Sequence, residues 1–263
     1  MRAKYADPTR RALAGFAAGG LAMLAGCASA ADVAAPASNG RIDVRPSTPA
    51  MPGVRSGQFR FEQAPKPLAF IPASLDRTKP APMMLLLHGA GGKGDMILRR
   101  FMPMAEARGV VLLAPDSERR TWDAIRGMQY GTEPAFGADV ARVEQALALM
   151  FAEANIDPQR LAIAGFSDGA SYALSLGLPN AGLFSHIIAM SPGGVAPFDG
   201  RAETRVFVSH GRKDSILAYD NTAKGIVPGL RGLGLPVEFV SFDGDHELRE
   251  AEMRAAFDWF LAR

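Results

Sequence analysis

The residues best suited to chemistry in this 263-residue chain are grouped around one serine. Residues 165–169 read Gly-Phe-Ser-Asp-Gly, between the short apolar run 161–164 and the helix-like run 170–178. A serine on a tight strand-to-helix turn projects out of the sheet, and the following helix directs its positive N-terminus at it. Flanking glycines prevent collisions with neighbouring backbone. The pattern predicts that Ser167 is a nucleophile, the alternative being an ordinary glycine-rich turn in a chain with 28 glycines.

A serine hydroxyl needs a base that takes its proton, and the chain has four histidines. His246 follows the last predicted strand, 237–242, and functional loops of an open α/β sheet gather where strands end. His88 and His210 lie in His-Gly turns at the ends of other strands, and His186 precedes an apolar strand. We predict His246 as the base because it lies in a late loop, well after the serine. The alternative is a solvated loop histidine.

The acid that orients the base is expected between the serine and the histidine, after another strand. Residues 205–209 form that strand, and the loop that follows them ends at Asp214. Asp214 could instead cap a helix N-terminus, and Asp220 is a second candidate acid. The chain order serine, aspartate, histidine differs from the orders of chymotrypsin and subtilisin.

A glycine-rich turn supplies the third part of the predicted site. Residues 85–92 read Leu-Leu-Leu-His-Gly-Ala-Gly-Gly, so an apolar strand ends in a turn whose backbone N–H groups can bind an anion. Acyl transfer develops a negative oxygen that such donors stabilise by several kcal/mol. We predict that the backbone N–H groups of Ala90 and Asp168 form this oxyanion hole, with their side chains incidental.

The same turn permits a different interpretation. Residues 89–94 match G-x-G-x-x-G between a strand and a helix, and Asp116 follows after the next strand. These are features of a dinucleotide site. A histidine directly before the first glycine has no role in binding pyrophosphate, however, and a dinucleotide site leaves Ser167, Asp214 and His246 unexplained. Dinucleotide binding is therefore the least favoured alternative.

The order of the predicted elements indicates a three-layer α/β sandwich. The first two strands resemble an antiparallel hairpin, and strands then alternate with helices, which favours a mostly parallel sheet. Only 14 residues separate the strands 187–190 and 205–209, which leaves no room for a lid domain. The predicted strands are 58–62, 68–71, 83–87, 110–113, 161–164, 187–190, 205–209 and 237–242, and the predicted helices are 95–107, 138–153, 169–176, 221–233 and 250–262.

The N-terminus has the composition of an export signal. A basic start is followed by an uncharged run, 12–26, which is too short to span a bilayer but suits a signal-peptide core. Residues 24–27 read Leu-Ala-Gly-Cys and resemble the bacterial lipobox, so we predict a signal peptide over 1–26 and lipidation of Cys27. The alternative is ordinary secretion with cleavage near 28–30. Cys27 is the only cysteine, so no internal disulfide is possible.

Composition and charge define the rest of the chain. The segment 27–55 is rich in Ala, Pro and Ser, which predicts a flexible tether between a membrane anchor and a single domain, 56–263. The whole chain carries a net charge of +2, and residues 1–26 contribute four basic residues and one acid, so the processed chain is near −1. This balance argues against nucleic-acid binding. We predict an exported protein, an outer-membrane lipoprotein facing the periplasm or the surface, otherwise periplasmic or secreted.

Together these motifs resemble the α/β-hydrolase superfamily, and within it the phospholipase/carboxylesterase and polyhydroxybutyrate-depolymerase-like esterases. The resemblance implies hydrolysis of small to medium carboxylic esters through an acyl-enzyme, without a cofactor or metal. The open alternatives are a catalytically inactive envelope-binding protein of the same fold and a serine peptidase. His88, Trp122, Tyr130 and Phe136 could line a substrate pocket or serve only packing. The motifs that carry the resemblance are 86–89, 114–117 with 121–123, 164–170, 209–211 with Asp214, and 242–244 with His246.

Overall fold

The computed structural model describes residues 40–49, 53–129, 131–198 and 202–262. The predicted signal peptide, Cys27 and Tyr130 lie outside these residues. In the part of the chain that the structure describes, no helix has the length and apolar character needed to cross a membrane.

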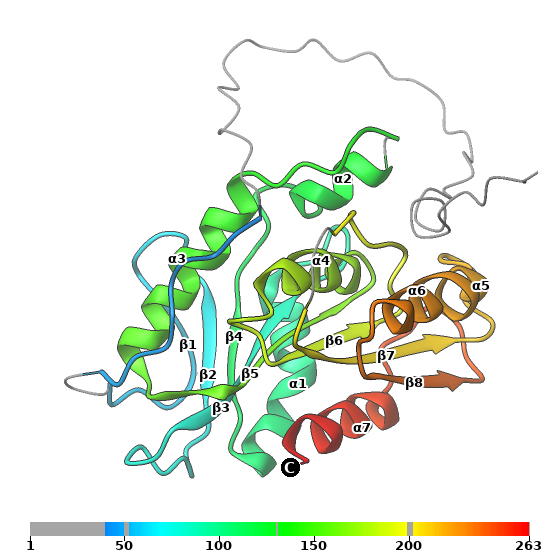
Figure 1. Ribbon diagram of the computed structural model, residues 1–263. Coiled ribbons are helices and arrows are strands. Elements are labelled where there is room, and N and C mark those ends of the chain that lie inside the picture. Colours follow the sequence, from blue (N-terminus) through cyan, green and yellow to red (C-terminus); the bar gives the residue numbers. More distant parts are fainter. Residues whose placement is uncertain (1–39, 50–52, 130, 199–201, 263) are drawn as a thin grey trace, which may run out of the picture.

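Within the described residues, eight strands form one sheet in the order β1-β2-β4-β3-β5-β6-β7-β8 (Figure 1). Strand β2 runs antiparallel to both of its neighbours, and all other neighbouring strands are parallel. The seven residues of β3 are all buried, as expected of a central strand covered on both faces. The strands are β1 Gly57–Arg60, β2 Leu68–Ile71, β3 Ala81–Leu87, β4 Val111–Ala114, β5 Ile156–Phe166, β6 His186–Met190, β7 Arg205–Gly211 and β8 Val237–Phe242.

Helices cover both faces of this sheet and make three layers (Figure 1). Alternate side chains of a strand point to opposite faces, so Leu85 and Leu87 enter the core beneath α3 and α4, whereas Met84 and Leu86 enter the core beneath α1 and α7. The α-helices are α1 Gly94–Arg108, α2 Asp123–Gln129, α3 Ala138–Glu153, α4 Asp168–Gly177, α5 Tyr219–Asn221, α6 Val227–Gly232 and α7 Glu250–Leu261, with a 3₁₀-helix η2 Leu178–Asn180 and a π-helix η3 Thr222–Ile226.

The predicted three-layer sandwich and its antiparallel N-terminal hairpin are confirmed, although several ends differ. Strand β5 begins at Ile156, earlier than predicted, because Ile156 pairs with Ala81 of β3. The predicted helix 221–233 consists of three successive pieces, α5, η3 and α6. Helix α2 was not predicted. No helix occurs in the described residues between β6 and β7, in agreement with the absence of a lid there.

The tether predicted over residues 27–55 includes residues that belong to the folded domain. The backbone N–H of Ile42 donates to Asn180 Oδ1 at 2.9 Å, and Ile42 is only 1% exposed. Glu144 Oε1 accepts from the backbone N–H groups of Asp43 and Val44. The prediction was therefore wrong for residues 40–49, which pack on the domain. Composition could not reveal this because both hydrogen-bonding partners lie about 100 residues or more away in sequence.

Candidate active site

Ser167 occupies a sharp turn between β5 and α4. Its backbone lies at φ 57° and ψ −122°, a region that side chains other than glycine rarely adopt. Such strain persists where the surrounding structure imposes it, and it concentrates at functional sites. A Cβ on Gly165 would lie 2.2 Å from the Gly169 carbonyl oxygen, and one on Gly169 would lie 2.0 Å from the Leu87 carbonyl oxygen. Only glycine fits at both positions, so these contacts produce the turn predicted around Ser167.

The predicted acid and base are in contact. His246 Nδ1 lies 2.7 Å from Asp214 Oδ2, and the Asp214 side chain is fully buried whereas that of His246 is 13% exposed. Because β7 and β8 are parallel neighbours, their C-terminal loops meet at one edge of the sheet. Asp245 joins the two loops by accepting from the backbone N–H and the hydroxyl of Ser215. The two loops thus hold Asp214 and His246 together.

The Asp214 carboxylate is held by several donors. The backbone N–H groups of Ile216 and Leu217 donate to Oδ1 at 2.9 and 2.7 Å. Burial opposes ionisation, but the Leu217 N–H and the His246 ring outweigh it, so the pKa of Asp214 lies below its ordinary value. Asp214 is therefore anionic near neutral pH and can hold His246 with Nδ1 protonated. This arrangement leaves His246 Nε2 available to accept a proton.

A second histidine contacts the same acid, which the sequence did not reveal. His210 Nε2 lies 3.0 Å from Asp214 Oδ2 and 3.0 Å from the Leu217 carbonyl oxygen. Because a carbonyl can only accept, we assign the ring proton to Nε2. Burial lowers the pKa of His210, whose side chain is fully buried, and this keeps the ring neutral. The sequence feature that could have indicated this contact is the four-residue spacing between His210 and Asp214 where β7 ends.

The base lies close to the predicted nucleophile. The ring of Phe166, the residue directly before Ser167, is 4.8 Å from the His246 ring between centroids. Gly89, in the glycine-rich turn, approaches from the other side, since a Cβ there would lie 3.2 Å from Ser167 Cβ. The structure thus brings Ser167, the base and the glycine-rich turn to the same edge of the sheet.

The glycine-rich turn presents the predicted oxyanion-hole amides. The N–H groups of Gly91 and Gly92 are used within loops, donating to the carbonyls of Arg120 and Gly89. Among the described residues the Ala90 N–H has no such acceptor. Asp168 is the first residue of α4, and the first N–H groups of a helix have no acceptor within it. Both amides are therefore open to an incoming oxygen.

The side chain of Asp168 makes hydrogen bonds of its own. Its Oδ2 accepts from Thr121 Oγ1 at 2.5 Å and from Gln129 Nε2 at 2.9 Å. These contacts connect the start of α4 to the ends of α2. They fix the backbone of Asp168, and with it the amide that the oxyanion hole would use.

His88 holds the base of the glycine-rich turn. Its Nδ1 lies 2.8 Å from the Gly89 carbonyl oxygen, and its Nε2 accepts from the Ser117 N–H at 3.1 Å. Trp122 Nε1 donates to the His88 carbonyl, and the Trp122 ring stacks on Tyr172. Trp122 is fully buried, which favours the packing alternative for this residue. Phe136 likewise packs against the core.

Asp116 has a different function from the one a dinucleotide site would give it. Its Oδ1 accepts from the Gly94 N–H at 2.7 Å, at the start of α1. Helix N-termini need such acceptors, and Lys93, the residue before the helix, provides no side-chain cap. The acid of the apparent fingerprint is therefore engaged in capping α1. No group of three or more His, Cys, Asp or Glu side chains in the described residues could hold a metal ion.

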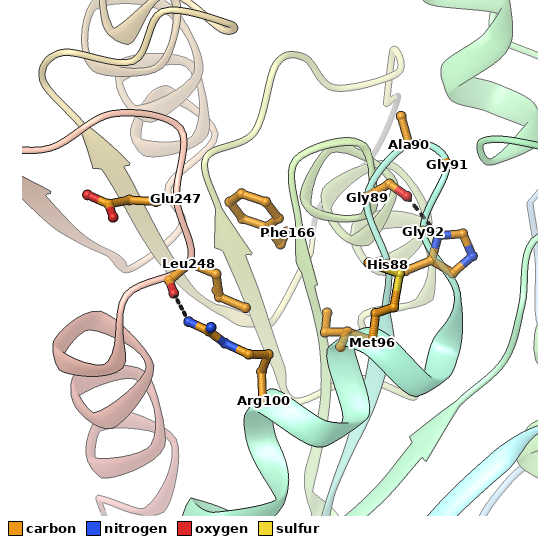
Figure 2. Close-up of a pocket in the computed structure, with 11 residues that line it drawn as sticks. His88, Gly89, Ala90, Gly91, Gly92, Met96, Arg100, Phe166, Glu247 and Leu248 are labelled. Carbon is orange, nitrogen blue, oxygen red and sulfur yellow. Dashed lines mark hydrogen bonds between the residues drawn. The ribbon is translucent and has the colours of Figure 1, made fainter.

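Two cavities are lined in part by the two residues that flank Ser167 in sequence, Phe166 and Asp168. The larger, about 490 Å³, is bounded by the glycine-rich turn, α1, Phe166 and the loop before α7 (Figure 2), and His88 lines its edge. The smaller, about 30 Å³, is lined by residues that include Gln129, Asp168 and Ser171.

Solved structures share this fold. The chain aligns with the fluorophosphonate-binding serine hydrolase FphF of Staphylococcus aureus at a TM-score of 0.63 and 12% identity, covering 81% of this chain and 100% of that one. A phospholipase/carboxylesterase of Dyadobacter fermentans matches at 0.57 and 20%, covering 81% and 100%. A Bacillus cereus carboxylesterase matches at 0.55 and 20%, covering 74% and 92%.

The chain has the α/β-hydrolase fold that these structures share. No protein-family model matches the sequence, and no curated protein matches it. The assignment of the fold therefore rests on the structure. The sequence motifs had predicted the same fold.

Proposed function

We propose that the protein is a serine hydrolase that cleaves carboxylic esters of small to medium acyl or alcohol groups. The observation that carries the proposal is the contact between His246 and Asp214 at the edge of the sheet where Ser167 stands on a strained turn. The structural likeness to carboxylesterases supports the same reaction class. A protein that only bound ligands would not need the strained serine or the paired acid and base.

The reaction would proceed in two halves. Ser167 Oγ attacks the ester carbonyl carbon while His246 Nε2 takes the hydroxyl proton, and the Ala90 and Asp168 amides stabilise the oxyanion. Asp214 holds Nδ1–H and balances the charge on the imidazolium. His246 then gives its proton to the departing alcohol. In the second half a water, deprotonated by His246, releases the acid and restores Ser167.

The central test uses Ser167→Ala. It should lower kcat for p-nitrophenyl esters by a factor on the order of 10⁶, with an unchanged circular dichroism spectrum and unfolding midpoint. A fluorophosphonate probe should label the wild-type protein once, at Ser167, as read by peptide mass spectrometry. Ser175→Ala is the matched control, because Ser175 lies on the same helix, lines neither of the two cavities and should leave the labelling intact.

A panel of p-nitrophenyl esters of increasing acyl length, assayed beside peptide p-nitroanilides, separates the esterase from the serine peptidase. We expect the esters to be cleaved and the anilides not. Retention of more than about a tenth of activity by Ser167→Ala would be inconsistent with its role as nucleophile, for which a far larger loss is typical. A wild-type protein that neither takes the probe nor cleaves either panel would favour the inactive binding protein.

We further propose that Cys27 is lipidated and anchors the exported domain in the outer membrane. The lipobox-like residues 24–27 support this. Wild-type protein from a Gram-negative host should fractionate with membranes, and Cys27→Ser should not, with its activity per folded molecule unchanged. An unmodified N-terminus at or beyond residue 31 would instead mean ordinary secretion.

A further inference from the structure

The larger cavity has an apolar wall and one basic side chain. Met96, Ile97, Phe166 and Leu248 supply apolar surface around it, and Met96 is an exposed large apolar side chain, 56% accessible (Figure 2). Arg100 lies four residues after Met96 on α1, so both occupy one face of the helix. The cavity thus offers an apolar surface with a cation on the same helix face.

Among the described residues, Arg100 has no acidic partner. Its Nη2 donates to the Leu248 carbonyl oxygen across the cavity wall (Figure 2). Within the described residues no carboxylate lies within 4 Å of its guanidinium, whereas the neighbouring Arg99 pairs with Asp95 at 2.8 Å. A guanidinium has five N–H donors, and the Leu248 contact orients the group while leaving other donors for a ligand.

Glu247, the other charged residue that lines the cavity, does not neutralise Arg100. Its carboxylate points away from Met96 and Arg100 (Figure 2), and its Oε1 lies against Gly244, where a Cβ would come within 2.4 Å of it. The charge that faces the cavity is therefore positive. An acyl or alkyl chain that extends from Ser167 along the apolar wall would bring its far end near this charge.

We infer that this cavity is a subsite for a medium-length chain that ends in an anion, a carboxylate or a phosphate, which Arg100 binds. The inference rests on the proposed ester hydrolysis and names its substrate class: half-esters of dicarboxylic acids, or esters of alcohols that carry a terminal anion. Arg100 would act on substrate binding and not on the chemical step, so its substitution should change KM and leave kcat unchanged.

The test compares matched charged and neutral esters. On the acyl side, the mono-p-nitrophenyl ester of adipic acid is paired with p-nitrophenyl hexanoate. On the alcohol side, butyrate esters of ω-hydroxyhexanoate and of ω-hydroxyhexyl phosphate are paired with hexyl butyrate. In at least one pair the charged ester should have a KM about three- to tenfold lower, because charge-assisted hydrogen bonds are strong but this site is open to solvent. The responding pair identifies both the orientation and the anion.

Arg100→Gln should abolish the preference with kcat for the neutral esters unchanged, and Arg99→Gln, the control on the same helix, should preserve it. Added salt should reduce the preference of the wild-type enzyme, since exposed charges are screened. Hydrolysis of all pairs with equal KM for charged and neutral members, or a preference that survives Arg100→Gln, overturns the subsite and leaves the esterase proposal standing. Absence of any hydrolysis would overturn both.

Discussion

The dipeptide His-Gly directly follows β3 and forms the end of β7, and the two histidines have different contacts. His88 at the end of β3 uses both ring nitrogens on backbone groups, those of Gly89 and Ser117. His210 at the end of β7 contacts the side chain of Asp214, and its Nδ1 is buried with no hydrogen-bond partner among the described residues. His88 therefore holds a loop in place, and His210 contacts the predicted acid.

The difference separates two ways of organising an active site. On the β3 side, the groups proposed to act are backbone amides, and buried side chains such as His88 and Asp168 contact the loops that carry them. On the β7 and β8 side, the groups proposed to act are side chains, and loop amides donate to Asp214. Substitutions on the first side should therefore change rate and stability without moving the pH profile. Substitutions on the second side should affect proton transfer directly.

The largest expected effect is on the β8 side. His246→Ala should lower kcat by a factor on the order of 10⁶, close to the loss in Ser167→Ala, and the double variant should lose little more, because the two groups act as one unit. Steady-state kinetics on the three proteins measures this. If His246→Ala kept its activity while His210→Ala lost it, the base would be His210 and the comparison would be reversed.

An intermediate effect is expected at His210. His210→Phe removes a donor to Asp214, and loss of a hydrogen bond to a charged group should cost roughly tenfold in kcat/KM. The Asp214 carboxylate would then have one donor fewer, and we expect the acid limb of the pH–kcat/KM profile to move to higher pH.

Two variants serve as controls for that shift. His210→Gln places a side-chain amide near the position of Nε2 and should restore most of the rate and the original limb. His88→Gln should lower the rate and the unfolding midpoint while leaving the limb in place. A limb that moves equally in His88→Gln and His210→Phe would contradict the separation of the two sides.

The smallest expected effect is on the free energy of unfolding, through the carboxylates of Asp123 and Asp139. Asp139 and Asp123 each accept the other's backbone N–H, at 2.8 and 3.0 Å. Burial raises the pKa of Asp139 to about 6 from 3.8. Between these values the folded chain holds a proton that the unfolded chain releases, so this group makes the fold more stable at pH 5 than at pH 7, by about 1 kcal/mol.

Asp139→Asn lacks this titration. The difference in free energy of unfolding between wild type and variant, from urea unfolding, should therefore favour the wild type by about 1 kcal/mol more at pH 5 than at pH 7. Taking this difference cancels the contributions of groups that titrate in both proteins. His186 is one such group, because burial lowers its pKa to about 4. A difference that does not change with pH would mean that Asp139 does not carry the buried charge.

Much of the fold was predictable because its signals are local. Central strands such as β3 are continuous apolar runs, and the helical spacing of apolar residues along α3 predicted its bounds, Ala138–Glu153, as found. Helix α2 was missed because seven residues containing a glycine have little helical periodicity. The start of α2 depends on the contact between Asp123 and Asp139, which are distant enough in sequence to leave no pattern.

The sequence by itself determined which residues could form the site. Ser167 is identified by its own turn, and Asp214 and His246 follow from chain order and from the rule that strand ends converge at one edge of a parallel sheet. These inferences need only short-range patterns and one rule of topology. They could not give the 2.7 Å contact between acid and base, but they named its partners.

Only the tertiary structure decided what the neighbouring polar residues do. His88 and His210 share the dipeptide His-Gly, and their different contacts come from the loops that follow β4 and β7. Asp116 fits a dinucleotide fingerprint in sequence, yet it caps α1 because folding places it beside the Gly94 N–H. Hydrogen-bonding partners far apart along the chain are chosen by packing, and packing leaves no periodic trace in the sequence.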